Sequence, residues 1–280
     1  MDATRRRRWW PCEFRISELW EFCKPLDNLH GCILGPPKAM IICHSNRYIF
    51  IHIHKTGGSS VEIALERSLQ WQDVMLGSTS FGEQANRHFS QRFGITKHSS
   101  ISDIYALRAS TNLRTYQVLS VVRHPLHRAV SLFNFMAGII EQIGLITKLT
   151  PSELRQRRAS LSADHRQLSW PSSIAYLESE GNFDAFVHNP NLDRARAFCS
   201  QYSQLSINEK LVDKLTVLRT EELAGDRAKA CLEAFTGAST PIPHANRSNK
   251  IMLKPDIVSN KARIALESRF LVDYNTFGYA

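Results

Sequence analysis

The stretch from Tyr48 to Ser60 reads Tyr48-Ile-Phe-Ile-His-Ile-His-Lys-Thr-Gly-Gly-Ser-Ser60. Residues 48–53 are β-branched, aromatic or otherwise compatible with a strand, which indicates a buried strand. The glycines then predict a loop, and apolar side chains follow at helical spacing, namely Val61, Ala64, Leu65 and Leu69. The sequence therefore predicts a strand, a glycine loop and a helix in direct succession.

This order of elements recurs along the chain. Tyr116 to Val122 predicts a second strand, and Pro125 soon after it suits the first position of a helix. Leu211 to Leu218 predicts another strand before a further helix. Because strands that alternate with helices build parallel sheets, the sequence predicts an α/β fold with three layers, in which helices flank a mainly parallel central sheet.

The size and composition of the chain favour one large domain. The chain has 280 residues, of which 43% are hydrophobic and 22% charged, enough for a full core. Residues 40–280 are expected to form a single domain with a mainly helical insertion at about 138–208. Residues 1–39 form an N-terminal extension of unclear role. No uninterrupted apolar run approaches the roughly 18 residues of a membrane span, so no transmembrane segment is expected.

The charge and the cysteines narrow the class of partner and the compartment. A formal net charge of +9 favours an anionic partner without choosing among nucleic acid, phosphorylated cofactors and acidic sugars. The six cysteines form no C-x-x-C pair, so reduced thiols are expected. The basic start, Arg5 to Arg8, is followed by acidic residues rather than an apolar segment, so a cytoplasmic location is expected.

The segment His54 to Ser60 is a candidate anion-binding loop. A helix N-terminus presents backbone N–H groups, and glycines let an anion approach the chain. Lys55 adds a full charge, and hydroxyls come from Thr56, Ser59 and Ser60. The alternative is an ordinary turn with a helix cap. The lysine precedes the glycines, unlike the lysine of a nucleoside-triphosphatase loop, and the chain has no S-x-x-K or S-D-N motif of penicillin-binding enzymes.

A second motif runs from Val121 to Ser131. Arg123 lies at the predicted carboxyl end of a strand, where open parallel sheets bind ligands. Ser131 lies two turns into the next helix, with Arg128 three residues before it on the same face. Arginine and serine together suit a phosphate. Taken alone, this motif favours ordinary surface ion pairs instead.

The two motifs together resemble the sulfotransferases, in particular the Golgi-type carbohydrate sulfotransferases and their soluble bacterial relatives. In that family, a segment close to F-I-H-I-P-K-T-G-G-[ST]-S binds the 5′-phosphosulfate of 3′-phosphoadenosine 5′-phosphosulfate (PAPS). A later V-R-[DN]-P-x-x-R-x-x-S segment binds the 3′-phosphate. Residues 50–60 and 122–131 match these segments in order. The resemblance covers roughly residues 40–279 and implies a P-loop-like fold.

Three weaker similarities follow, and two residues depart from the pattern. Residues 218–223, 244–248 and 270–279 are similar to the family's R-x-E-x-L, P-H-x-N-x-S and D-x-x-x-F-x-Y segments. His54 stands where the family usually has proline, which puts the cofactor affinity in doubt. His124 stands where it has Asp or Asn, and we expect it to cap or orient the turn.

The resemblance implies roles for particular residues. Lys55 and the amides of Gly57, Gly58, Ser59 and Ser60 would hold the leaving phosphate and the sulfuryl oxygens. Thr56 and Ser59 would bind the 5′-phosphate. Arg123 and Ser131 would bind the 3′-phosphate, and Arg247 and Lys250 would close over the nucleotide. PAPS is then the co-substrate, PAP the product, and the scheme requires no metal.

The acceptor hydroxyl needs a general base, and histidine suits that task at neutral pH. We expect His98, which precedes a capped helix and matches a Lys-His pair of the relatives, with His88 in reserve. The expected acceptor is a saccharide or glycolipid. Two alternatives stay open, a P-loop-type kinase-like phosphotransferase and an inactive relative that binds PAP. No nucleic-acid partner is expected, because the distinctive residues gather at strand ends rather than among aromatics on one face. The sequence predicts no oligomeric state.

Overall fold

The computed structural model describes residues 39–77, 80–107, 112–243 and 253–279. The described residues all belong to one compact unit, Pro36–Ala280. The N-terminal extension, the segment 244–248, Arg247 and Lys250 lie outside the described residues.

The central sheet of this unit has five strands in the order β3-β1-β2-β4-β7. Their bounds are β1 Ala39–Cys43, β2 Tyr48–Ile51, β3 Val74–Gly77, β4 Gln117–Val122 and β7 Leu215–Arg219. β2, β4 and β7 pair in parallel, whereas β1 is antiparallel to both of its neighbours. The sheet is therefore mixed, and the prediction of a mainly parallel sheet is wrong. The reason is that β1 and β2 are consecutive strands joined by a short turn, which permits only antiparallel pairing.

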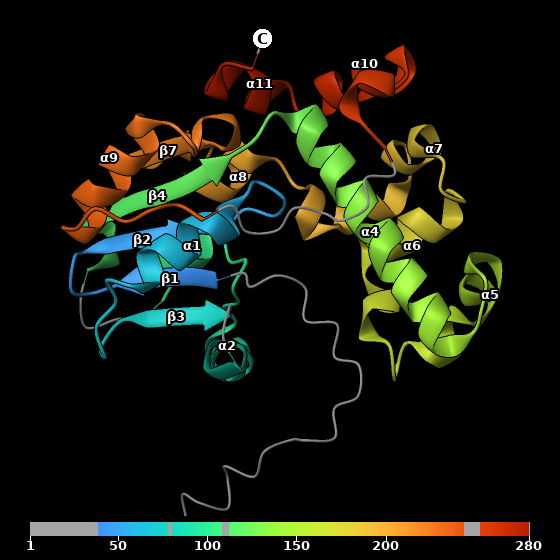
Figure 1. The fold of residues 1–280 in the computed structure, drawn as a ribbon, viewed down its shortest axis with the longest axis horizontal. Coiled ribbons are helices and arrows are strands. Elements are labelled where there is room, and N and C mark those ends of the chain that lie inside the picture. Colours follow the sequence, from blue (N-terminus) through green and yellow to red (C-terminus); the bar gives the residue numbers. More distant parts are fainter. Residues whose placement is uncertain (1–38, 78–79, 108–111, 244–252, 280) are drawn as a thin grey trace, which may run out of the picture. The chain divides into compact units, whose positions relative to one another are not determined.

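The strands alternate their side chains between two apolar layers. Tyr48 and Phe50 lie in one layer with residues of α1 (Gly58–Glu66) and α9 (Asp226–Thr236). Ile49 and Ile51 lie in the other, on the opposite face of the sheet. The helices with residues buried in that second layer are α3 (Ile101–Tyr105), α8 (Gln201–Leu205) and α11 (Leu271–Phe277), and α2 (Ser80–Phe93) packs against it with Ala85 and Phe89. Helices thus cover both faces of the sheet (Figure 1).

A third apolar cluster belongs to the helices between β4 and β7. Its helices are α4 (Pro125–Thr147), α5 (Pro151–Leu161), α6 (Pro171–Glu178) and α7 (Phe183–Val187), joined by α10 (Asn260–Arg269). Figure 1 shows α4 leaving the end of β4 and running to α5 and α6. The remaining elements are the hairpin β5–β6 (Ser206–Ile207 and Lys210–Leu211) and short 3-10 turns.

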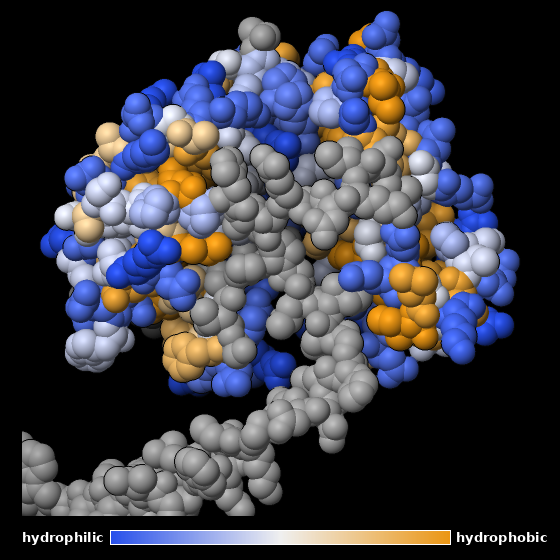
Figure 2. All heavy atoms as spheres, in the orientation of Figure 1, coloured by the Kyte–Doolittle hydropathy of each residue, from blue (hydrophilic) through white to orange (hydrophobic). Residues whose placement is uncertain are grey.

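Helix α4 has 23 residues and is long and apolar enough to cross a membrane, by length and composition alone. Its apolar residues do not form an uninterrupted run, because Glu141 and Gln142 lie among them. Half of its most apolar window is buried inside the fold. Its exposed apolar residues include Leu145 and Ile146 at its end. Figure 2 shows apolar residues in separate places on a mostly hydrophilic face.

Candidate functional site

The predicted glycine loop connects β2 to α1, and its backbone conformation leaves the start of α1 open. Gly57 is the N-cap residue, with φ 78° in the left-handed region, and no side chain caps the helix. The first amides of an α-helix mostly lack a partner within the helix, and they carry the positive end of its dipole. In α1 the amide of Ser60 donates to the carbonyl of Gly57 at 3.1 Å. Ser59 and Ser60 in that first turn are buried. This geometry suits an anion.

Lys55 adds backbone strain and a cation to the same loop. Its φ is 65°, a left-handed conformation that costs a non-glycine residue about 1–3 kcal/mol. Its ammonium lies over the ring of Phe135 on α4, 4.2 Å from the ring centroid. The loop thus holds Lys55 against the helix that carries the second motif.

Thr56 shapes the loop from within. Its side chain is fully buried, and its hydroxyl donates a hydrogen bond to the carbonyl of Ile53 at 2.9 Å. A hydroxyl has one proton to donate, so this bond leaves none for a phosphate. The expectation that the Thr56 hydroxyl binds the 5′-phosphate therefore does not fit this conformation, and its backbone amide is the remaining donor.

Arg123 meets the loop directly. Its Nη1 donates to the carbonyl oxygen of Lys55 at 3.3 Å. Burial lowers the pKa of the Arg123 guanidinium, and the nearby Glu221 raises it. An arginine stays charged under such opposing effects, because its ordinary pKa is far above neutrality. The two sequence motifs, distant along the chain, therefore lie side by side.

The backbone of Arg123 is held by the buried side chain of Gln201. The amide nitrogen of Arg123 donates to Oε1 of Gln201 at 2.9 Å, and Nε2 of Gln201 donates back to the Arg123 carbonyl at 2.8 Å. Asp273, also buried, accepts from the backbone amides of Gln201 and Tyr202 and from the hydroxyl of Ser200. The start of α8 thus fixes the end of β4.

Thr220 joins the ends of β4 and β7 to the glycine loop that follows β2. It follows β7, and its hydroxyl lies at hydrogen-bonding distance from the carbonyls of Val122 and Thr56. The carboxyl ends of the parallel strands β2, β4 and β7 therefore meet at one place, where open sheets bind ligands.

Ser131 lies on α4 between the motif's start and Phe135. Residues four apart share one face of a helix, so Ser131 lies one turn from the ring that supports Lys55. Ser131 is partly exposed. The structure thus places Ser131 on the face of α4 that the loop approaches.

Arg128 does not join this face. It is 2% exposed, its Nη2 donates to the carbonyl of Cys199 at 2.6 Å, and its guanidinium lies over the ring of Phe270. The sequence expectation that grouped it with Ser131 is wrong, because its position on α4 points into the helical core. Arg128 therefore has a packing role.

His98 lies against two histidines of the first motif. Its ring centroid is 3.6 Å from that of His54 and 5.3 Å from that of His52. His52 is buried and pairs with the buried carboxylate of Glu62 on α1. The expected base therefore stands beside the loop. His88, the reserve, lies on α2 and packs against the rings of Phe89 and Phe93.

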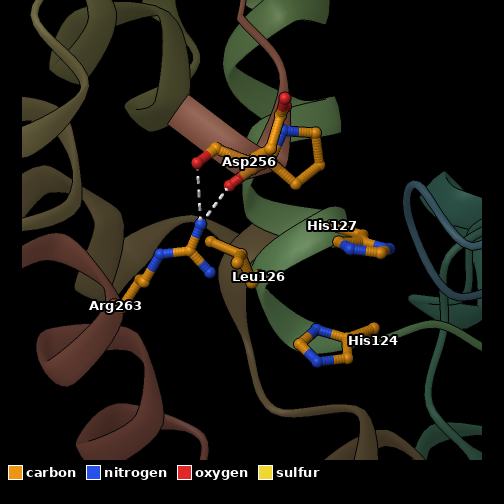
Figure 3. Close-up of a pocket in the computed structure, with 6 residues that line it drawn as sticks. His124, Leu126, His127, Asp256 and Arg263 are labelled. Atoms are coloured by element: carbon orange, nitrogen blue, oxygen red, sulfur yellow. Dashed lines mark hydrogen bonds between the residues drawn. The ribbon is translucent and has the colours of Figure 1, made fainter. Parts of the chain in front are cut away.

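His124 and His127 form a second pair of histidines at the start of α4. Their rings stack with centroids 4.7 Å apart (Figure 3). We expected His124 to cap or orient the turn. It is the N-cap residue of α4, but its side chain makes no capping hydrogen bond, so the capping part of that expectation is wrong. Its backbone amide donates to Glu221 at 3.1 Å. A pocket of about 420 Å³ opens beside them, lined also by Leu126, Pro255, Asp256 and Arg263.

Several residues that position the site were not singled out from the sequence. They are His52, Glu62, Phe135, Gln201 and Thr220. Two of them could have been found from the sequence. His52 is a histidine within an apolar run, and Phe135 lies one helical turn after Ser131. Gln201 could not, because its contact spans 78 positions of sequence.

Comparison with known proteins agrees with this geometry. The model of the sulfotransferase family matches residues 38–280. The chain therefore belongs to the sulfotransferase family, whose general reaction is the transfer of a sulfuryl group. Searches among curated proteins and among solved structures give no match.

Proposed function

We propose that the protein transfers a sulfuryl group from PAPS to a hydroxyl of a carbohydrate, either a free saccharide or a glycolipid. One observation carries the proposal: the guanidinium of Arg123 bonds to the backbone of Lys55, so a cationic strand end and an open helix N-terminus face one ligand. Family membership supports the same donor. A nucleotide with phosphate at both its 3′ and 5′ positions suits two such sites.

The donor's 5′ end is assigned to the loop. The amides of Gly57, Gly58, Ser59 and Ser60, the amide of Thr56 and the hydroxyl of Ser59 would hold the 5′-phosphate and the sulfuryl oxygens. Lys55 would leave the ring of Phe135 to neutralise the departing phosphate. Donors aimed at developing charge stabilise the transition state more than the bound substrate.

The 3′-phosphate is assigned to Arg123 and Ser131. Arg247 and Lys250 are proposed to close over the nucleotide, and both lie outside the described residues. This phosphate distinguishes PAPS from other adenine nucleotides, so these residues would give the donor specificity.

His98 is proposed as the general base. As the acceptor oxygen forms its bond to sulfur, the bond from sulfur to the 5′-phosphate oxygen breaks, and the hydroxyl proton passes to the His98 imidazole. The close packing of His98 on His54, beside Lys55, supports a position at the 5′ end of the donor. In-line attack requires this arrangement.

Incubation of the protein with radiolabelled PAPS and a panel of glycans, glycolipids and phenols tests this function. We expect label on a carbohydrate hydroxyl. The His98→Ala variant is expected to lose at least about 100-fold in turnover while it still binds PAP, since general base catalysis contributes about 10²–10⁴. His188→Gln, on an exposed histidine at the end of α7, is the control.

Transfer to phenols alone would contradict the carbohydrate acceptor. Loss of PAP binding in His98→Ala would show that His98 holds the loop rather than takes a proton.

A further inference from the structure

His127 occupies a special place between the two residues assigned to the 3′-phosphate. It precedes Ser131 by four positions on α4, so these two share one face of the helix, and the charge of Arg123, which precedes the helix, acts on the His127 imidazole. Its side chain is 39% exposed, so a ligand can reach it. The resemblance to the sulfotransferases assigns it no role.

The surroundings of His127 are rich in charge. Arg123 and Arg263 act on it as cations, and its Nδ1 lies 3.9 Å from the carboxylate of Glu221. Its ring stacks on the ring of His124. The charge of Glu267 acts on His124, whose ring also makes edge contacts with the rings of Tyr274 and Tyr279. Asp256 lines the same pocket.

Arg263 is already engaged in that pocket. Its guanidinium donates to the backbone carbonyls of Pro255 and Asp256 (Figure 3). It also donates to the carbonyl of Val258 at 3.1 Å. The imidazoles of His124 and His127 are therefore the remaining nitrogen-bearing side chains of this pocket that could bind an anion. Nδ1 of His124 is buried and has no hydrogen-bond partner among the described residues.

We propose that His127 binds the 3′-phosphate of the donor nucleotide between Arg123 and Ser131, as an imidazolium that gains its proton when the nucleotide binds. The inference rests on the proposed function, and it adds a titrating residue to the site. His124, stacked behind it, keeps the ring in place and stays neutral, since two adjacent imidazoliums repel each other.

In the free protein the pKa of each imidazole is lowered from its ordinary value, against a raising effect of Glu221 on both. Burial lowers the pKa of His127, and Arg123 lowers it further. Burial also lowers the pKa of His124, as does His127 itself. A phosphate dianion has the opposite effect and raises the pKa of the imidazole that it touches. Binding therefore takes up a proton, and affinity increases as the pH falls.

The expected slope follows from this linkage. Uptake of one proton changes the dissociation constant at most about tenfold per pH unit. We expect PAP to bind about 5- to 10-fold more tightly at pH 6.5 than at pH 8. AMP lacks the 3′-phosphate and is expected to show less than half of that change.

The test is calorimetric titration of the full chain with PAP and with AMP at several pH values. Two buffers of different ionisation enthalpy measure the proton uptake on the unmodified protein. The His127→Gln variant keeps a hydrogen-bond donor but cannot gain a charge, so its PAP affinity should be nearly independent of pH. His188→Gln should behave like the unmodified protein.

Two outcomes overturn the proposal in different ways. A preference for PAP over AMP without proton uptake, or with an unchanged pH dependence in His127→Gln, refutes the role of His127 and leaves the proposed function standing. An unmodified protein that binds PAP and AMP equally refutes the proposed function itself.

Discussion

Single residues in and around the loop determine its geometry. His52 and Glu62 are both buried and paired, and a Cβ on Gly58 would lie 3.2 Å from the His52 ring. Removal of one partner from such a pair costs roughly 3–5 kcal/mol, because the other is left buried and unpaired. The pair therefore anchors the N-terminal half of α1 to β2 and the residues that follow it.

For single residues, the sequence predicted which side chains lie at the site better than it predicted their packing and hydrogen-bond partners. Lys55, Arg123, Ser131 and His98 were identified from motifs, and the structure places them around one loop. The prediction that Arg128 acts together with Ser131 was wrong, because helical spacing predicts which side of a helix a residue lies on but not which other segments pack against that residue. The Thr56 hydroxyl was misassigned because a short loop offered it a carbonyl three residues back.

The Lys55→Ala variant tests the central cation of the loop. We expect turnover to fall by about 100- to 1,000-fold, as for removal of one transition-state donor. PAP affinity should fall much less, since the amides remain. Lys261→Ala, on the exposed side of α10, should leave both unchanged. Full activity in Lys55→Ala would remove this residue from the mechanism.

At the scale of elements, the strand–loop–helix units were predictable and the first strand was not. The apolar run before the loop and Pro125 before α4 indicated β2 and α4 correctly. β1 was missed because its five residues follow a segment without periodicity, and it is recognisable as a strand only through its pairing with β2 and β3. That pairing makes the sheet mixed.

Two glycines allow a matched test of the start of α1. Gly57 and Gly237 both have left-handed φ, 78° and 73°. A Cβ at Gly57 would lie 3.3 Å from Thr220, whereas nothing lies within 4 Å at Gly237. We expect Gly57→Ala and Gly237→Ala each to lower the free energy of unfolding by about 1–2 kcal/mol, measured in urea.

Only Gly57→Ala should also weaken PAP binding, by at least about tenfold. Equal PAP affinity in the two variants would show that the loop conformation does not matter for the ligand.

At the scale of the whole molecule, β4, β7 and the loop after β2 meet at one end of the sheet. Thr220 bonds to the end of β4 and to the loop, and Gln201 bonds to the backbone of Arg123. The motifs predicted that the loop and Arg123 would serve one ligand. The side chains that hold the strand ends together could not be predicted, because their partners are far away in sequence and show no periodic pattern.

The most direct measurement is the affinity of the purified protein for adenosine 3′,5′-bisphosphate against that for AMP, by isothermal titration calorimetry. Charge-assisted hydrogen bonds contribute about 1.5–3 kcal/mol, so the bisphosphate should bind roughly 10- to 150-fold more tightly. Arg123→Gln should remove most of that difference. Equal affinities for the two nucleotides would contradict the claim that the loop and Arg123 bind opposite ends of one donor.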